Sequence, residues 1–238
     1  MAYDKVVDST VLEDGLTQIA DAIREKGDLG DLFTSPLTFP SGFVSAIEGL
    51  SGGGATEPYI EETYDANGHL TAAVMHGHTT VRSSAFYFCS SLISVTLPDS
   101  VTQIMNGAFS MCSNLTSVAL PDGITILAAD AFRNCPKLEL TALPASIMKI
   151  YNYAFDGCSK LALTTLPASV TNIEYRAFAA CSGLTTITFL GTPTSIDSAA
   201  FKSCSNLTTI NVPWAEGAVA NAPWGATNAT IHYNVSGV

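Results

Sequence analysis

The stretch AFSMCSNLTSVALPDGITILAAD, residues 108–130, decides how this sequence folds, because its pattern recurs six times in the chain at one fixed interval. Each unit carries an Ala-Phe pair, a cysteine three positions after the phenylalanine and a leucine three positions later. The phenylalanines are Phe86, Phe109, Phe132, Phe155, Phe178 and Phe201, and the cysteines are Cys89, Cys112, Cys135, Cys158, Cys181 and Cys204. Apolar columns at one fixed period indicate a solenoid, in which each unit buries its apolar side only against its neighbours.

Within the unit, the segment from Leu115 to Leu120 alternates between apolar and small residues, which predicts a short strand that ends before Pro121. The Val-Thr-x-Ile segment predicts a second, shorter strand. Apolar residues at i, i+3 and i+6 in the A-F-x-x-C-S-x-L segment predict a short helical turn. The sequence therefore predicts an α/β repeat solenoid of six 23-residue units, with a parallel sheet on one side and short helical turns on another.

Units three and four depart from this pattern. Their middle leucines, Leu140 and Leu163, stand one place earlier than the valine or isoleucine of the other units. A slip of one position moves a side chain to the other face of a strand. We therefore expect a bulge or small kink in the sheet at these two units.

The six units resemble the BspA-type leucine-rich repeats of bacteria, the 23-residue class also seen in a treponemal repeat protein. The resemblance covers residues 81 to about 213. It implies a curved, right-handed solenoid on a surface protein that binds host proteins, bacterial partners or matrix, with no catalysis by the repeat itself.

Composition divides the chain into five parts. Residues 1–50 are a helical module for attachment or assembly, with apolar residues on one face of each of two predicted helices; residues 51–58 are a flexible linker rich in glycine. Residues 59–80 are an N-terminal cap, in which Asn67-Gly68 indicates a hairpin with a type I′ turn. Residues 81–211 are the leucine-rich-repeat solenoid, and residues 212–238 are a C-terminal cap with two tryptophans.

The N-terminal module, from Leu16 to Gly27 and from Leu37 to Gly49, resembles a module at the start of phage and prophage tail structural proteins. The ending from Val212 to Tyr233 is similar to the end of such repeat proteins. This resemblance implies a virion component that attaches to other virion proteins through residues 1–50, and that forms a homo-oligomer if those helices meet in other copies of the chain.

Composition and charge exclude several classes of partner. Hydrophobic residues make up 47% of the 238 residues, and the formal net charge is −11, so a negative surface would repel nucleic acid. No apolar run reaches the roughly 18 residues of a membrane span. The N-terminus lacks the basic and apolar regions of a secretory signal peptide. We expect a protein that is not inserted in a membrane and that belongs to a virion, the extracellular space or the cell surface.

Motifs for catalysis, metals and cofactors are missing from the sequence. Cysteines in equivalent positions point the same way, so we expect free buried thiols, and no C-x-x-C pair indicates zinc. His76 and His78 stand on one face of a predicted exposed strand without further ligands. An enzyme of glycan metabolism would need two close carboxylates or a metal site, and neither is found. We therefore predict that the protein is not an enzyme and binds no cofactor or metal.

Candidate ligand-binding residues come from the positions that vary between units, just after the Val-Thr-x-Ile segment. Tyr151, Tyr153, Tyr175 and Arg176 fall on neighbouring units and are predicted to form one surface patch, since tyrosine and arginine are enriched in binding hot spots. The alternative is that they are ordinary solvated turns. The strand face, with small residues such as Ser94, Thr188 and Asn211, offers a second, flatter surface.

The leading hypothesis is a non-catalytic binding protein of a phage tail, whose solenoid contacts a protein or glycan on a host or bacterial surface. The alternatives are a BspA-like cell-surface adhesin and an architectural spacer without a ligand of its own.

Overall fold

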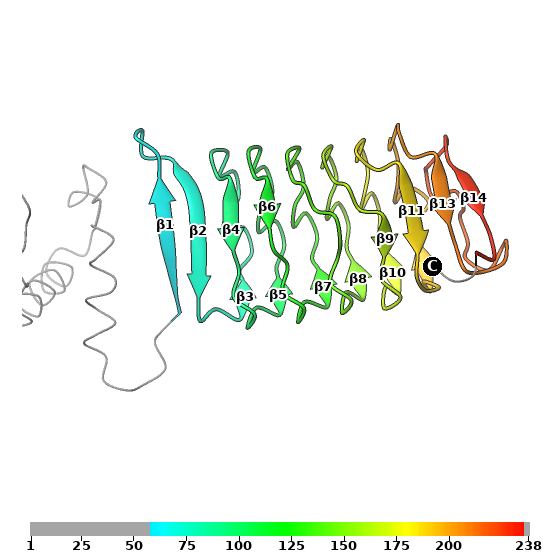
Figure 1. Ribbon diagram of the computed structural model, residues 1–238, viewed down its shortest axis with the longest axis horizontal. Helices are drawn as coiled ribbons and strands as arrows, with labels where there is room; N and C mark the ends of the chain where they lie inside the picture. The colour runs from blue at the N-terminus through cyan, green and yellow to red at the C-terminus, as the bar shows by residue number, and fades with distance from the viewer. Residues whose placement is uncertain (1–57, 236–238) are drawn as a thin grey trace, which may run out of the picture. The chain divides into compact units, whose positions relative to one another are not determined.

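The computed structural model describes residues 58–235, which form one row of stacked coils (Figure 1). The predicted helical module of residues 1–50 and most of the predicted linker lie outside the described residues. Within the described range, successive coils pair in parallel with equivalent residues of the repeat side by side, as in the pairing of Val95 with Val118. The predicted solenoid with parallel sheets is therefore confirmed.

The strands form three sheets. One long column of short strands is the predicted Val-Thr-x-Ile strand: β3 (Thr80–Val81), β5 (Gln103–Ile104), β7 (Ile126–Leu127), β8 (Lys149–Ile150), β10 (Asn172–Ile173) and β12 (Ser195–Ile196). The second column begins with the sheet of β1 (Tyr59–Tyr64), β2 (Leu70–His76), β4 (Ser94–Thr96) and β6 (Ser117–Val118). It resumes with the sheet of β9 (Thr165–Leu166), β11 (Thr186–Phe189), β13 (Thr209–Asn211) and β14 (Thr230–His232).

The second column is interrupted at the units where the middle leucine is displaced. No strand occurs in the corresponding part of unit three, and unit four forms only the short β9. Single hydrogen bonds carry the stacking across the gap: the Glu139 N–H donates to the Thr116 carbonyl at 3.0 Å, and the Ala162 N–H donates to the Leu140 carbonyl at 3.1 Å. The displaced leucine thus breaks the ladder without separating the coils.

The predicted short helical turns are wrong, because residues 58–235 contain no helix. In the A-F-x-x-C segment, N–H groups donate alternately within the turn and to the next coil. The Tyr87 N–H donates to the Ser84 carbonyl at 3.0 Å, whereas the Phe86 N–H donates to the Ala108 carbonyl at 2.8 Å. A helix would satisfy these donors within its own segment. The stacked coil offers acceptors outside the segment, and the chain instead forms successive turns with Ser84 and Phe88 at positive φ.

We call these turn segments, together with the residues just before them, the turn edge. It consists of residues 82–90, 105–113, 128–136, 151–159, 174–182 and 197–205.

The core is a ladder of phenylalanine rings that runs along the solenoid. The six rings of the phenylalanine column are buried, and adjacent rings stack in parallel with centroids 5.1 to 5.5 Å apart. All six cysteines are free, and five are buried. Each of those five thiols donates to the carbonyl of a phenylalanine in the preceding coil, as Cys158 does to Phe132 at 3.0 Å. Burial raises the pKa of the Cys158 thiol to about 12, so this thiol stays protonated at neutral pH.

Different structures stand at the two ends of the described range. At the N-terminal end, β1 and β2 form an antiparallel hairpin, and β2 pairs with β4. The turn is not of type I′, because Gly68 has a positive φ and Asn67 does not. Instead, the Asp65 carboxylate accepts from the Asn67 and His69 N–H groups at 2.8 and 2.9 Å. These bonds, the one from His69 most, hold the pKa of Asp65 below its ordinary value.

At the C-terminal end, buried aromatic side chains pack together. Trp214 and Trp224 are 6% and 0% exposed, and the Trp224 indole N–H donates to the Ala220 carbonyl at 2.7 Å. The ring of Phe189 lies edge-on to Trp214, with centroids 5.2 Å apart. β14 continues the parallel sheet by pairing with β13.

Candidate binding surface

The turn edge repeats one backbone conformation while its side chains change from coil to coil. One column holds Ser84, Gly107, Asp130, Tyr153 and Arg176, all with φ between 55° and 64°. The N–H groups at 107, 130 and 153 each donate to a carbonyl of the next coil, at 2.9 to 3.0 Å. The scaffold therefore fixes the backbone of this column, and the side chains project from it with different chemistry.

Three of the four predicted ligand-binding residues are brought together. The rings of Tyr153 and Tyr175 meet edge to face, with centroids 5.4 Å apart, and Tyr175 is 42% exposed. The guanidinium carbon of Arg176 lies 5.7 Å from the Tyr153 ring centroid. Tyr151 is half-buried and makes no ring contact with this group. Residues Tyr153, Tyr175 and Arg176 therefore form a cluster on two adjacent coils.

Two further charged residues belong to this cluster and were missed. The guanidinium of Arg133 lies 4.6 Å from the Tyr153 centroid, on a third coil. Asp156 is only 8% exposed and pairs with both arginines: its Oδ1 accepts a hydrogen bond from Arg176 Nη2 at 3.2 Å, and its Oδ2 forms an ion pair with Arg133 Nε at 3.5 Å. Arg133 and Asp156 occupy equivalent positions of neighbouring units, so the repeat period could have shown that opposite charges lie on adjacent coils. We call these five residues the Arg-Tyr cluster.

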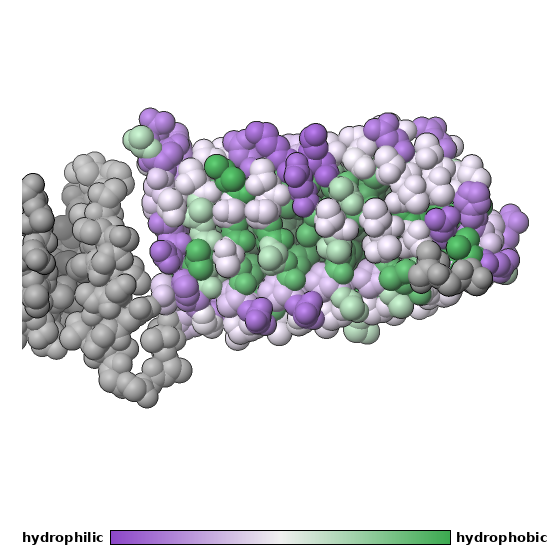
Figure 2. Space-filling view, in the orientation of Figure 1, coloured by the Kyte–Doolittle hydropathy of each residue, from purple (hydrophilic) through white to green (hydrophobic). Residues whose placement is uncertain are grey.

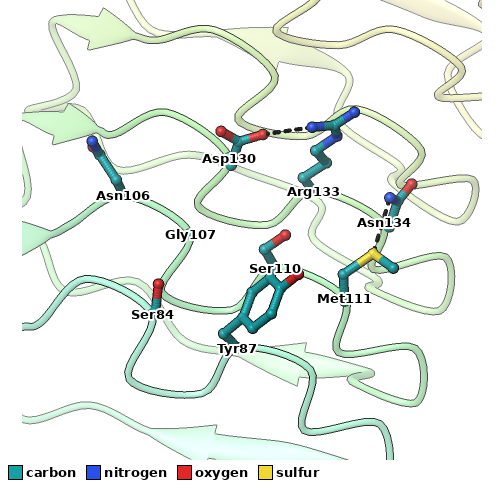
Figure 3. A pocket seen from close by; sticks show the side chains of 9 residues that line it. All are labelled: Ser84, Tyr87, Asn106, Gly107, Ser110, Met111, Asp130, Arg133 and Asn134. Atoms are coloured by element: carbon teal, nitrogen blue, oxygen red, sulfur yellow. Dashed lines mark hydrogen bonds and ion pairs between the residues drawn. The ribbon is translucent and has the colours of Figure 1, made fainter.

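Beside the Arg-Tyr cluster, the turn edge of the first three coils is hollowed (Figure 3). The cavity has a volume of about 510 Å³. We call it the hollow; it is lined by Ser84, Tyr87, Asn106, Gly107, Ser110, Met111, Asp130, Arg133 and Asn134. Arg133 faces both features, because its guanidinium pairs with Asp130 at 3.1 Å in the hollow and with Asp156 in the cluster.

The strand face has a different character. Figure 2 shows hydrophobic residues along the middle of this face and polar residues along its margins. Exposed apolar side chains of the described range include Ile93, Ile126, Met148 and Leu190.

The described residues hold no group of three or more histidine, cysteine or acidic side chains that could bind a metal ion. The ring of His76 stacks on Tyr59 with centroids 4.4 Å apart, and its Nε2 lies 3.5 Å from a Glu61 carboxylate oxygen. The same range contains no helix with the length and hydropathy to cross a membrane.

The stacked parallel strands, the buried phenylalanine ladder and the variable turn edge define a leucine-rich-repeat solenoid, and proteins of this class are generally non-catalytic binding proteins. The chain belongs to the family described as BspA type leucine rich repeat region: six copies match residues 79–213, more than half of its length. None of the curated proteins matches the chain.

Solved structures share the fold. A leucine-rich repeat protein from Bacteroides ovatus ATCC 8483 is 21% identical with a TM-score of 0.52, over 67% of this chain and 47% of that one. The T. pallidum leucine rich repeat protein is 26% identical with a TM-score of 0.52, over 64% of this chain and 81% of that one. A leucine rich cell surface protein from Faecalibacterium prausnitzii A2-165 is 31% identical with a TM-score of 0.48, over 57% of this chain and 39% of that one.

Proposed function

We propose that this protein is a non-catalytic binding protein whose solenoid engages a partner on a bacterial or host surface through the turn edge. The observation that carries this proposal is the contrast between columns. The phenylalanine and cysteine columns are invariant, whereas the turn-edge columns that begin at Arg82, Ser83, Ser84, Tyr87 and Phe88 change residue at every coil. Aromatic and arginine side chains gather there, and such side chains dominate the binding energy of protein interfaces.

The Arg-Tyr cluster is the first part of this surface to test. Tyr175 presents its ring to solvent, and Arg176 and Arg133 are held over Tyr153 by the Asp156 carboxylate. Since these side chains are already fixed, binding loses little of their conformational entropy. Preorganised aromatic and cationic groups therefore favour this cluster as a contact site.

The test is binding of the fluorescently labelled chain to intact bacterial and epithelial cells, measured by flow cytometry. We expect substitution of Tyr151, Tyr153 and Tyr175 by alanine to weaken binding at least tenfold. Tyr64→Ala, which removes an exposed tyrosine from the hairpin, is the control. Unchanged binding by the triple variant would refute the role of the Arg-Tyr cluster, and absence of binding to all cells would refute the proposed function.

For the biological setting we propose a phage tail or another virion assembly, with residues 1–50 as the attachment module. Its support is the resemblance of those residues, and of residues 212–233, to tail structural proteins. Light scattering should give a trimer or larger assembly for the full chain and a monomer for a chain that begins at Glu57. If both are monomers, the setting is instead a bacterial cell-surface adhesin, which the family membership favours.

A further inference from the structure

The hollow exists because the first coils have small side chains at positions where later coils have large ones. Gly107 has no side chain, and Ser84 and Ser110 have short ones. In later coils the equivalent positions hold Tyr153 and Asp156, which both belong to the Arg-Tyr cluster. The volume of about 510 Å³ falls within the range of about 300–1,000 Å³ typical of small-molecule sites. The hollow is therefore a feature of three particular coils and not of the repeat.

Three of the polar side chains that line the hollow lack hydrogen-bond partners within residues 58–235. The side chains of Ser84, Asn106 and Ser110 make no hydrogen bond in that range. Asn152 occupies the same column as Asn106, and its Oδ1 accepts from the Tyr175 N–H at 3.1 Å. The amide of Asn106 is thus free for a ligand, whereas its counterpart two coils later is part of the scaffold.

The hollow is close to neutral and has an aromatic wall. The Arg133 guanidinium is compensated by Asp130 at 3.1 Å and by Asp156 at 3.5 Å. Tyr87 is 56% exposed and stands at the rim, where its ring offers a flat apolar surface (Figure 3). A ligand that suits these walls is uncharged, has several hydroxyl groups that both donate and accept, and has one apolar C–H face.

We propose that the hollow binds a neutral carbohydrate, one or two sugar rings of a surface glycan, with one ring stacked on Tyr87 and its hydroxyls bonded to Asn106, Ser84 and Ser110. The inference rests on the proposed function and specifies the chemistry of the surface partner. A peptide fits less well, because protein hot spots need a desolvated apolar centre and here hydroxyl and amide groups surround the centre. The binding is reversible and involves no covalent step.

Two variants test the site, and each introduces a residue type that another coil already has at the equivalent position. Asn106→Ala places alanine where the next coil has Ala129, and Gly107→Tyr places tyrosine where a later coil has Tyr153 at φ 59°. A Cβ at Gly107 would first meet the Ser84 Oγ at 3.6 Å, an ordinary contact, so we expect the tyrosine side chain to enter the hollow without displacing the backbone. Ser198→Ala, in the same column as Asn106 at the far end of the solenoid, is the control.

The experiment is binding of the labelled full chain to a microarray of neutral and sialylated oligosaccharides. We expect binding to neutral glycans, a loss of about tenfold with Asn106→Ala, a complete loss with Gly107→Tyr and no change with Ser198→Ala. Circular dichroism checks that each variant is folded. No bound glycan, or glycan binding that both hollow variants retain, would overturn the inference.

Intact cells treated with periodate or with protease separate this inference from the proposed function. Periodate cleaves vicinal diols of sugars and leaves most protein epitopes, so we expect it to abolish cell binding. Cell binding that survives periodate and is lost with protease would refute a glycan as the ligand and would leave the proposed function standing. Binding to the microarray without binding to any cell would keep the site and contradict the surface role.

Discussion

Replacing Phe155 by alanine is expected to destabilise the solenoid more than the same change at Phe86. Phe155 is fully buried, and its ring stacks on Phe132 at 5.5 Å and on Phe178 at 5.4 Å. Phe86 is 2% exposed but has one stacked neighbour, Phe109 at 5.2 Å. The chemistry of the substitution is the same, so the difference isolates the position in the ladder.

The expected cost for Phe155→Ala is about 3–5 kcal/mol, the range for a buried phenylalanine whose cavity cannot close. A stacked aromatic pair adds about 0.5–1.5 kcal/mol beyond the buried area. Phe86→Ala loses one such pair where Phe155→Ala loses two, so it should cost less by about that amount. The end coil can also relax around the gap, which lowers the cost further.

Urea unfolding, followed by circular dichroism and by tryptophan fluorescence, measures both effects. The chain has two tryptophans, Trp214 and Trp224, and both report on the C-terminal coils, whereas circular dichroism reports on all coils. The two probes should coincide in the parent chain and separate in Phe155→Ala, because the cavity weakens the coupling between halves. Equal losses in the free energy of unfolding at the two positions, or a loss below about 1 kcal/mol at Phe155, would refute the claim that the stacked phenylalanines stabilise the solenoid.

Three further predictions concern buried and crowded groups. Burial raises the pKa of Cys158 from 9.0 to about 12, so its stabilising contribution is complete below pH 9 and is lost as the pH rises from there towards 12. Urea unfolding between pH 8 and 10 should show that the free energy of unfolding falls with pH less steeply in Cys158→Ala than in the parent chain, by up to about 1.4 kcal/mol per pH unit. Replacing both Arg133 and Arg176 by alanine should lower the free energy of unfolding by about 3–5 kcal/mol, more than the two single changes together, because it leaves the Asp156 carboxylate buried without a partner. Adding Asp156→Asn should restore part of the lost stability, and strict additivity of the single changes would contradict this account. Gly191→Ala should lower the free energy of unfolding by about 1–3 kcal/mol, since the new Cβ would stand 2.4 Å from the Ala168 carbonyl oxygen, and an unchanged melting temperature would show that the coils can separate there.

The sequence was sufficient for the coil period and for the identity of the buried columns. Equivalent residues of stacked coils must lie side by side, so a phenylalanine at the same position of every unit places its rings next to one another. The displaced leucines, Leu140 and Leu163, also marked where the second strand column is interrupted. These features follow from the alternation of apolar residues within each unit and from the fixed period, and both can be read from a single sequence.

The helical turns were wrong for a physical reason. Apolar spacing at i and i+3 fits a 3₁₀ turn and equally fits turns that bury one face against a neighbouring coil. The choice depends on where the backbone N–H groups find acceptors, and the Phe86 N–H finds one at Ala108, in the next coil. A hydrogen bond between coils leaves no periodic signal in the sequence of one coil.

The proximity of the candidate binding residues was predicted in part. The neighbouring coils bring Tyr153, Tyr175 and Arg176 together, because adjacency in the repeat is adjacency in space. The hollow was not predicted, because its cause is a missing side chain at Gly107, and a glycine in a turn is ordinarily explained by its backbone.

Gly107 shows why that ordinary explanation does not hold here. Its φ of 64° is matched by Ser84 at 58°, Tyr153 at 59° and Arg176 at 55° in the same column. Positive φ is uncommon for residues with a side chain, and its cost is offset here by hydrogen bonds that the N–H groups at 84, 107, 130 and 153 donate to the next coil. Since the same column holds serine, aspartate, tyrosine and arginine in this conformation, glycine is not required by the backbone at 107. What glycine contributes there is space, and a space between hydroxyl and amide groups without partners is what a binding site requires.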